Sequence, residues 1–249
     1  NHPRLRLQVL AAGMHFVKDR GLTVREIRQA GFRIAAKVRA PASREDATWM
    51  GEALGEMTKG FSKALARLKP DWLLVLGDRA EPLSAALAAT ELGGIAIAHL
   101  HGGEVTGHRL DDQGRRLLTA MAHLHLPATR LSAGRIRNMG EAPWRIRVVG
   151  APGLDAIREL GLPPWKGPRT YLLLIQHAVP HQAADAGRQI RETLKALDRV
   201  GMPVIASLPN PDAGGQAVVR ALRAHPRLIL TSNLPHSEYL ALLRGAAAL

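Results

Sequence analysis

Two spacings of apolar residues alternate along the chain. Short continuous apolar runs that end at Gly or Pro are typical of buried parallel strands, and longer stretches with an apolar residue every three or four positions are typical of helices. Runs of the first kind predict strands at 6–13, 31–34, 72–76, 95–100, 123–128 and 145–149. Stretches of the second kind predict helices at 23–27, 44–68, 81–92, 110–122 and 132–139.

The dense Pro/Gly cluster at 163–168 interrupts this rhythm and predicts a linker. The rhythm then restarts, because strands are expected at 171–175, 204–207 and 227–230, and helices at 184–200, 215–225 and 238–243. Strand–helix alternation predicts an α/β fold made of doubly wound parallel sheets. We therefore expect two Rossmann-like domains, an N-terminal one at 1–160 and a C-terminal one at 169–249.

Composition narrows the classes of function. The 249 residues carry a net charge of +13, contain no Cys and are only 4% aromatic. Without Cys, thiolate metal sites, disulfides and Cys nucleophiles are excluded. The basic residues are scattered, and few aromatics are present as stacking platforms, which argues against nucleic acid and favours a small anionic substrate. No apolar run reaches membrane-spanning length, so a cytoplasmic protein without a membrane partner is expected.

Charged residues follow two neighbouring predicted strands at their carboxyl ends, where ligands bind in doubly wound sheets. Asp78 and Arg79 follow the first strand and Glu104 follows the second, while Asp111 and Asp112 begin the next helix. Neighbouring carboxylates raise one another's pKa, so the sequence predicts one acid and one base in this crevice. The alternative for Asp78 is a helix N-cap, a common role of Asp before a helix.

Histidines offer a rival interpretation. His99 with His101, and His123 with His125, each place two imidazoles on one face of a predicted strand, a spacing that also suits a metal-dependent hydrolase. Buried histidines held by hydrogen bonds are the alternative. His177 follows the first strand of the second domain and is a candidate acid or base at the crevice.

The segment 209–215 ends a predicted strand and opens a helix. Free amide groups at such a helix start can hold a phosphate, ribose or uracil, and Asn210 lies among them. A plain Pro-Asx turn is the alternative.

Together these motifs resemble the UDP-N-acetylglucosamine 2-epimerase family, and in particular its hydrolysing branch, which releases N-acetylmannosamine for sialic-acid-type sugars. The resemblance runs nearly end to end. It is carried by GMH at 13–15, LGDR at 76–79, IAHLHGGEVT at 97–106, LDD at 110–112, HLH at 123–125, VGAPGLD at 149–155, QH at 176–177 and PNPDAG at 209–214.

The resemblance implies a glycosyltransferase-B-like pair of Rossmann domains, a homodimer, and a UDP-sugar substrate with no cofactor or metal. It implies elimination of UDP to a 2-acetamidoglucal, followed by hydration with inversion at C2. Arg79 and Asn210 would contact the nucleotide, His15 would line the sugar end, and His101 stands where some relatives carry a carboxylate. The residues on or beside the acid–base positions are Asp78, Glu104, Asp111, Asp112 and His177.

Departures from the family pattern keep other functions open. After Asp112 the family typically reads Ser-Ile-Arg-His, whereas this chain reads QGRR at 113–116, which puts a Gly inside a predicted helix. The family's opening strand with its phosphate loop, and its Gly- and Ser-rich diphosphate segment, are not found within the 249 residues, so we expect a truncated chain. The alternatives are a non-hydrolysing 2-epimerase, a 2,4-diacetamido-sugar relative, an inactive UDP-sugar-binding homologue and the metal-dependent hydrolase.

Overall fold

A computed structural model describes residues 2–18, 21–41, 48–107, 109–159, 161–162, 165–209, 213–232 and 234–249. The chain divides into two compact units, Asn1–Ala151 and Pro152–Leu249. The division falls ahead of the Pro/Gly cluster, because helix α6 (Pro152–Glu159) packs on α9 (His236–Gly245) of the second unit. Ile157 of α6 contacts the buried pair Leu240 and Ala241 there.

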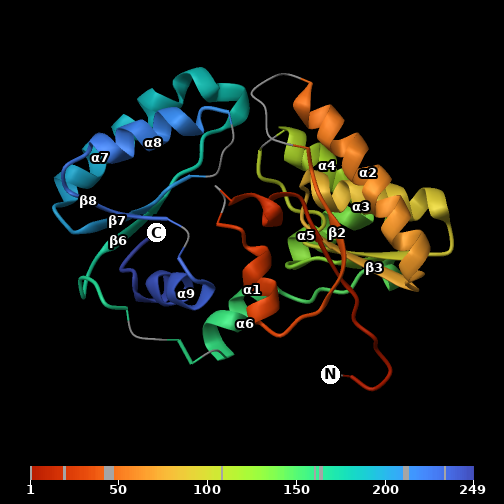
Figure 1. The fold of residues 1–249 in the computed structure, drawn as a ribbon. Helices are drawn as coiled ribbons and strands as arrows, with labels where there is room; N and C mark the ends of the chain where they lie inside the picture. The colour runs from red at the N-terminus through yellow and green to blue at the C-terminus, as the bar shows by residue number, and fades with distance from the viewer. Residues whose placement is uncertain are drawn as a thin grey trace. The chain divides into compact units, whose positions relative to one another are not determined.

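Unit 1 holds two parallel sheets. Strands β1 (Val9–Ala12) and β2 (Ile34–Val38) form one, and β3 (Trp72–Leu76), β4 (Ala96–Leu100) and β5 (Leu124–Leu126) form the other. Figure 1 shows α2, α3 and α4 side by side; α3 and α4 pack on the three-stranded sheet, and α2 packs on β2 and α3. The helical elements of unit 1 are η1 (Gly13–Phe16), α1 (Val24–Gln29), α2 (Trp49–Leu68), α3 (Ala80–Leu92), α4 (Arg109–Met121), α5 (Arg130–Asn138) and η3 (Pro143–Arg145).

The core of unit 1 lies between that sheet and its helices. Leu73 and Val75 of β3 and Ile97 of β4 face it, and Phe61 and Leu65 of α2 cover them. Because successive strand residues point to opposite faces, one alternate set of β3 side chains supplies this core. Small Ala residues along α3 let α2 pack closely against it.

The sequence predicted β3 as a central strand buried on both faces, and this is wrong. Trp72, Leu74 and Leu76 alternate with the core residues and are exposed, Leu74 to 60%. Within the described residues, β3 pairs only with β4, and β1 pairs only with β2. A cavity of about 900 Å³ is lined by residues of both β1 and β3. An apolar run reports hydrophobicity but not how many neighbours a strand has.

The predicted strand at 145–149 is also absent from the described structure. The chain there forms η3 and one isolated parallel bridge between His125 and Ile146. Two backbone hydrogen bonds, from Arg147 to His125 and from Val149 to Pro127, hold the segment beside β5. The apolar pattern therefore identified a segment that lies along the sheet without continuing its ladder. Helix α6 was not anticipated at all.

Unit 2 repeats the strand–helix alternation. Strands β6 (Leu172–Ile175), β7 (Val204–Ser207) and β8 (Leu228–Thr231) form a parallel sheet in that order. Helices α7 (Ala186–Val200) and α8 (Gly215–Ala224) cover one face, and α9 covers the other, as Figure 1 shows. The short η4 (Pro180–Asp185) precedes α7. Helices on both faces are the arrangement of a doubly wound sheet.

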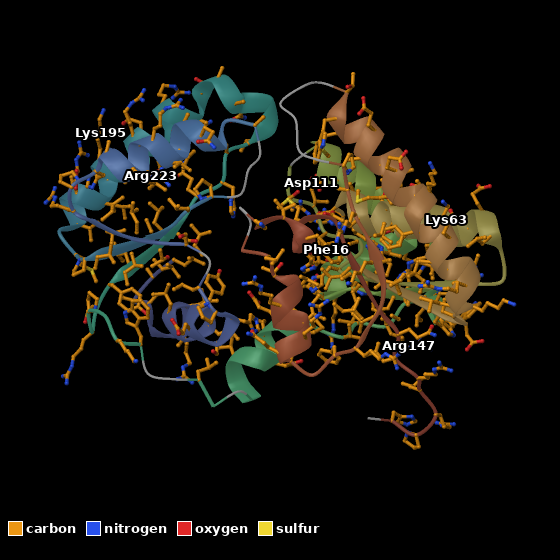
Figure 2. All side chains as sticks on the ribbon, in the orientation of Figure 1. Phe16, Lys63, Asp111, Arg147, Lys195 and Arg223 are labelled. Carbon is orange, nitrogen blue, oxygen red and sulfur yellow. The ribbon has the colours of Figure 1, made fainter. Side chains whose placement is uncertain are left out.

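Charged side chains occupy the outer helix surfaces. Lys63 of α2 and Lys195 of α7 are exposed on these surfaces in Figure 2. Among the described helices, none combines the length and the apolar character that crossing a bilayer requires. The predicted α/β class with parallel sheets is confirmed by both units.

Candidate functional site

The carboxyl ends of β3 and β4 in unit 1 carry a cluster of acidic side chains. Asp78 follows β3 through Gly77, whose φ of +78° turns the chain away from the sheet. His101 follows β4 with a φ of +60°, a left-handed conformation that His tolerates better than most residues. Glu104 lies three residues further on. Backbone strain of this kind concentrates at functional sites, where the surroundings hold it in place.

Arg115 of α4 joins three of the predicted site residues. Its guanidinium donates to Asp112 Oδ1 at 2.8 Å and to the Glu104 backbone oxygen at 2.9 Å, and it forms an ion pair with the carboxylate of Asp78. Its side chain is only 5% exposed. Asp78, Glu104 and Asp112 therefore meet around one buried cation.

Arg115 is not among the site residues that the sequence predicts; it lies in the atypical stretch 113–116. A usable signal was present, since Asp112 and Arg115 are three residues apart and lie on the same face of the helix. Its link to Asp78, which lies 37 residues earlier in the chain, has no signature in the sequence.

Asp78 is not the helix cap that its position had suggested. Arg79 occupies the N-cap of α3, where no side-chain cap bond forms, and the Asp78 carboxylate turns instead toward Arg115. Burial raises the pKa of Asp78 above its usual value; Arg115 opposes this shift and Asp111 adds to it. A partly exposed carboxylate with a raised pKa suits proton transfer.

Asp112 has a different environment. Its two carboxylate oxygens accept from the Thr106 amide at 3.0 Å, the Thr106 hydroxyl at 3.1 Å, the Gly107 amide at 3.1 Å and Arg115. Burial pushes the pKa of Asp112 upward, but these hydrogen bonds outweigh it and hold the pKa below its usual value. A carboxylate this fully bonded anchors the loop after β4 to the start of α4.

His101 and Glu104 form a pair within the same loop. His101 Nδ1 lies 2.7 Å from Glu104 Oε1, and both side chains are partly exposed. With the Glu104 backbone oxygen bonded to Arg115, the pair is tied to the Asp78 carboxylate through one side chain. The cluster thus holds two candidate proton-transfer groups, Asp78 and the His101–Glu104 pair, which are linked through Arg115.

Glycines in this region are required by contacts within the protein. A Cβ on Gly103 would lie 2.3 Å from the Ser132 backbone oxygen, and one on Gly114 would lie 2.7 Å from the Asp78 backbone oxygen. Gly103 therefore lets the loop after β4 approach α5, and Gly114 lets α4 approach the turn that carries Asp78.

The paired histidines do not form a metal site within the described residues. His99 Nε2 lies 2.8 Å from the Gly77 oxygen, while His101 bonds Glu104, outside the strand. His123 Nδ1 accepts from the Ile97 amide at 3.1 Å, and His125 Nε2 lies 3.0 Å from Glu141 Oε2. Each pair is thus divided between separate partners. His99 and His125 are buried, as expected of structural histidines, whereas His101 is partly exposed and His123 is exposed.

Two predicted binding residues border the cavity of about 900 Å³ in unit 1. His15 lies in η1 after β1 and bonds Thr23 Oγ1 through Nδ1 at 2.8 Å. Arg79 is largely exposed, with its Nε 3.5 Å from Glu81 Oε2. A Cβ on Gly13 would collide with Glu81, so the ends of β1 and β3 lie close together.

The other predicted residues belong to unit 2. His177 lies two residues beyond β6 and is exposed, so a carboxyl strand end presents it as the sequence predicted. Asn210 lies outside the described residues. Its proposed contact with the nucleotide stays a prediction.

Comparison with known proteins identifies the family. A family model described as UDP-N-acetylglucosamine 2-epimerase matches residues 1–249, the whole chain. The chain belongs to the UDP-N-acetylglucosamine 2-epimerase family.

Relatives in this family differ in the substrates that their names state. The chain is 31% identical to the UDP-N,N'-diacetylbacillosamine 2-epimerase (hydrolyzing) of Legionella pneumophila, over 96% of this chain and 66% of that protein. It is 28% identical to the UDP-N-acetylglucosamine 2-epimerase of Neisseria meningitidis, over 99% of this chain and 67% of that protein. The chain therefore spans about two thirds of the length of these curated relatives.

Solved structures of 2-epimerases share the fold. The Neisseria meningitidis UDP-GlcNAc 2-epimerase, crystallised with UDP-GlcNAc, matches with a TM-score of 0.74 at 15% identity, over 98% of this chain and 69% of that one. The Methanocaldococcus jannaschii UDP-GlcNAc 2-epimerase, in complex with UDP-GlcNAc and UDP, matches with a TM-score of 0.69 at 17% identity, over 95% of this chain and 76% of that one. The predicted glycosyltransferase-B-like fold class is that of these epimerases.

Proposed function

We propose that the protein is a hydrolysing 2-epimerase that converts UDP-N-acetylglucosamine and water to N-acetylmannosamine and UDP. The observation that carries the proposal is the Asp78–Arg115–Glu104 cluster at the carboxyl ends of β3 and β4. Family membership supports the UDP-sugar substrate. The hydrolysing outcome is favoured by the Legionella relative, whose name states it.

The reaction needs a base in its first half. Asp78 takes the proton from C2 of the sugar, the C1–O bond breaks, and UDP leaves with the bonding electron pair, which gives a 2-acetamidoglucal. Its raised pKa and partial exposure make Asp78 the strongest candidate among the described carboxylates. Asp112 is the poorest, because its oxygens are already bonded. Asp111 contributes negative charge beside Asp78.

The second half adds water with the opposite stereochemistry. A proton returns to C2 from the other face of the ring, and hydroxide from water bonds to C1, so the net change is one water consumed. The His101–Glu104 pair, with its nitrogen and oxygen 2.7 Å apart, can supply one proton and remove another. We assign a further acid–base role to His177, and nucleotide contacts to Arg79 and Asn210, with His15 at the sugar. Assembly as a homodimer also stays a prediction.

One assay tests the proposal directly. The purified protein is incubated with UDP-N-acetylglucosamine in D2O, and proton NMR follows UDP and the free sugar. We expect UDP together with N-acetylmannosamine that carries deuterium at C2, because that C–H bond breaks and re-forms from solvent. Free N-acetylglucosamine without deuterium would contradict the elimination, UDP-N-acetylmannosamine would indicate the non-hydrolysing reaction, and absence of turnover would indicate a binding homologue.

A single substitution locates the chemistry. Asp78→Asn should lower kcat by about 10²- to 10⁴-fold, the usual contribution of a general acid or base. The matched control is Asp71→Asn, at the other end of β3, where the side chain is exposed; it should keep wild-type kcat. Equal kcat in both variants would remove Asp78 from the mechanism. A loss of turnover with chelator would favour the metal-dependent hydrolase.

A second substrate has specific support. The relative at 31% identity is named for UDP-N,N'-diacetylbacillosamine, a 2,4-diacetamido sugar. The same assay with that nucleotide sugar ranks the two by kcat/KM.

A further inference from the structure

We propose that His99 is a positioning residue for Asp78, acting through the Gly77 backbone carbonyl. The ring of His99 is fully buried, its Nε2–H donates to the Gly77 oxygen at 2.8 Å, and its Nδ1 lies 3.4 Å from the hydroxyl of Thr119. This role rests on the function proposed above, in which Asp78 moves a proton.

The Gly77 turn needs such support because glycine has no side chain to restrict it. Gly77 stands at φ +78°, and its own amide donates to the Leu100 oxygen at 3.1 Å. The Gly77 carbonyl accepts from His99 and the Gly77 amide donates to Leu100, so strand β4 bonds both backbone polar groups of Gly77. The next backbone oxygen, that of Asp78, lies against Gly114 of α4. The Asp78 backbone is therefore fixed by β4 and α4 before its carboxylate meets Arg115.

The state of the imidazole suits a permanent hydrogen bond. Burial lowers the pKa of His99 to about 4, so the ring is neutral near pH 7. A carbonyl accepts only from a protonated nitrogen, which places the single proton on Nε2 and leaves Nδ1 to accept from Thr119. His99 consequently orients the turn and does not itself exchange protons at neutral pH.

Packing holds the ring in this orientation. A Cβ on Gly102 would lie 3.0 Å from His99 Nδ1 and 3.2 Å from the Thr119 hydroxyl, so the backbone at Gly102 closes the ring in. Val75 of β3 is the register partner of His99, which places the ring on the face that α4 covers. Side chains that orient the ligands of a metal site in this way typically contribute about 10- to 100-fold to activity, and we expect the same order for a side chain that orients a carboxylate.

Three substitutions of His99 separate the effect of its hydrogen bond from the effect of its side-chain volume. His99→Gln keeps an N–H near the place of Nε2, His99→Phe keeps the ring volume without a donor, and His99→Asn keeps an amide too short to reach. UDP release and thermal unfolding are measured for each. Ser84→Ala is the matched control, because Ser84 is equally buried and its hydroxyl donates to the Leu54 oxygen at 3.3 Å, on α2.

We expect kcat to fall about 10- to 100-fold in His99→Phe and His99→Asn with KM unchanged, to return close to wild type in His99→Gln, and to stay unchanged in Ser84→Ala. Hydrogen exchange of the segment 77–79 should speed up in the Phe and Asn variants only. If Gln is as impaired as Asn, or Asn as active as wild type, the proposal is overturned. Should the wild-type protein release no UDP, the proposed function fails, and hydrogen exchange alone decides whether His99 holds the turn.

Discussion

At the scale of single residues, environment separates two aspartates of identical chemistry. Burial raises the pKa of Asp78 above its usual value, the Arg115 guanidinium opposes this shift, and the nearby Asp111 carboxylate adds to it. Asp112 has a lowered pKa because two amides, a hydroxyl and Arg115 bond its oxygens. Carboxylates in such contrasting surroundings divide proton transfer and anchoring between them. Substitution of Asp78 should therefore affect mainly turnover, and substitution of Asp112 mainly stability.

Asp112→Asn should destabilise the protein by about 1–3 kcal/mol at pH 7, because an amide cannot accept from all of the donors that the carboxylate serves. The lowered pKa of Asp112 contributes stability above the usual carboxyl pKa of 3.8, and this contribution is lost as the pH falls through the lower folded value. The gap between wild type and variant should therefore narrow as the pH falls below 3.8. Urea unfolding of both proteins from pH 7 to pH 3 measures this difference in the free energy of unfolding.

Exposed Asp155 of α6 supplies the control for this series. Asp155→Asn should change stability by less than about 0.5 kcal/mol at any of these pH values. A gap that persists unchanged at pH 3 would show that Asp112 stabilises the loop by shape and not by charge.

At the scale of elements, close approach of α4 to the β3–α3 turn builds the cluster. Gly114 makes the approach possible, since a Cβ there would lie 2.7 Å from a backbone oxygen that cannot swing aside. Helix propensity alone disfavours Gly in this position by about 1 kcal/mol relative to Ala. The unexpected Gly that the sequence placed within a helix is thus explained by packing.

Gly114→Ala should lower stability by about 1–3 kcal/mol despite the better helix propensity, because the added methyl group forces α4 away from Asp78. Activity should fall with it. Gly134→Ala in α5 is the control, where nothing lies within 4 Å of the new Cβ, and it should gain up to about 1 kcal/mol. Thermal unfolding of both variants decides the matter, and a stabilised Gly114→Ala would refute the close approach.

At the scale of the whole molecule, each unit has a core of its own. The largest apolar cluster draws its buried residues from Ala12 to Ala122, within unit 1. Among the described residues, three further clusters lie within unit 2. Helices α7 and α8 contribute to one of them, α9 to the second, and α6 together with α9 to the third. A unit that buries its own apolar surface meets the main requirement for folding alone.

We therefore expect residues 152–249, produced alone, to unfold cooperatively on heating and to retain an α/β circular dichroism spectrum. Residues 1–151 provide the comparison. A non-cooperative transition with strong binding of a hydrophobic dye would mean that unit 2 depends on contacts outside itself.

Much of the element order followed from local patterns. The strands 72–76 and 204–207 were predicted with the bounds that the structure has, and most helices within a few residues. The spacing of apolar residues and the positions of Gly and Pro are properties of neighbouring residues, so they can be read directly from a short stretch of sequence. The same patterns located Asp78, Glu104 and His101 at strand ends.

Contacts between segments that are distant in the sequence could not be predicted from such local patterns. The pairing of Arg115 with Asp78, the bond from His99 to Gly77 and the exposed face of β3 depend on which elements pack together and in what register. The energies that choose among packings are sums over many weak contacts, each of them invisible in a short window of sequence. Local composition thus sets which chemical groups stand at the strand ends, and packing sets which of them meet.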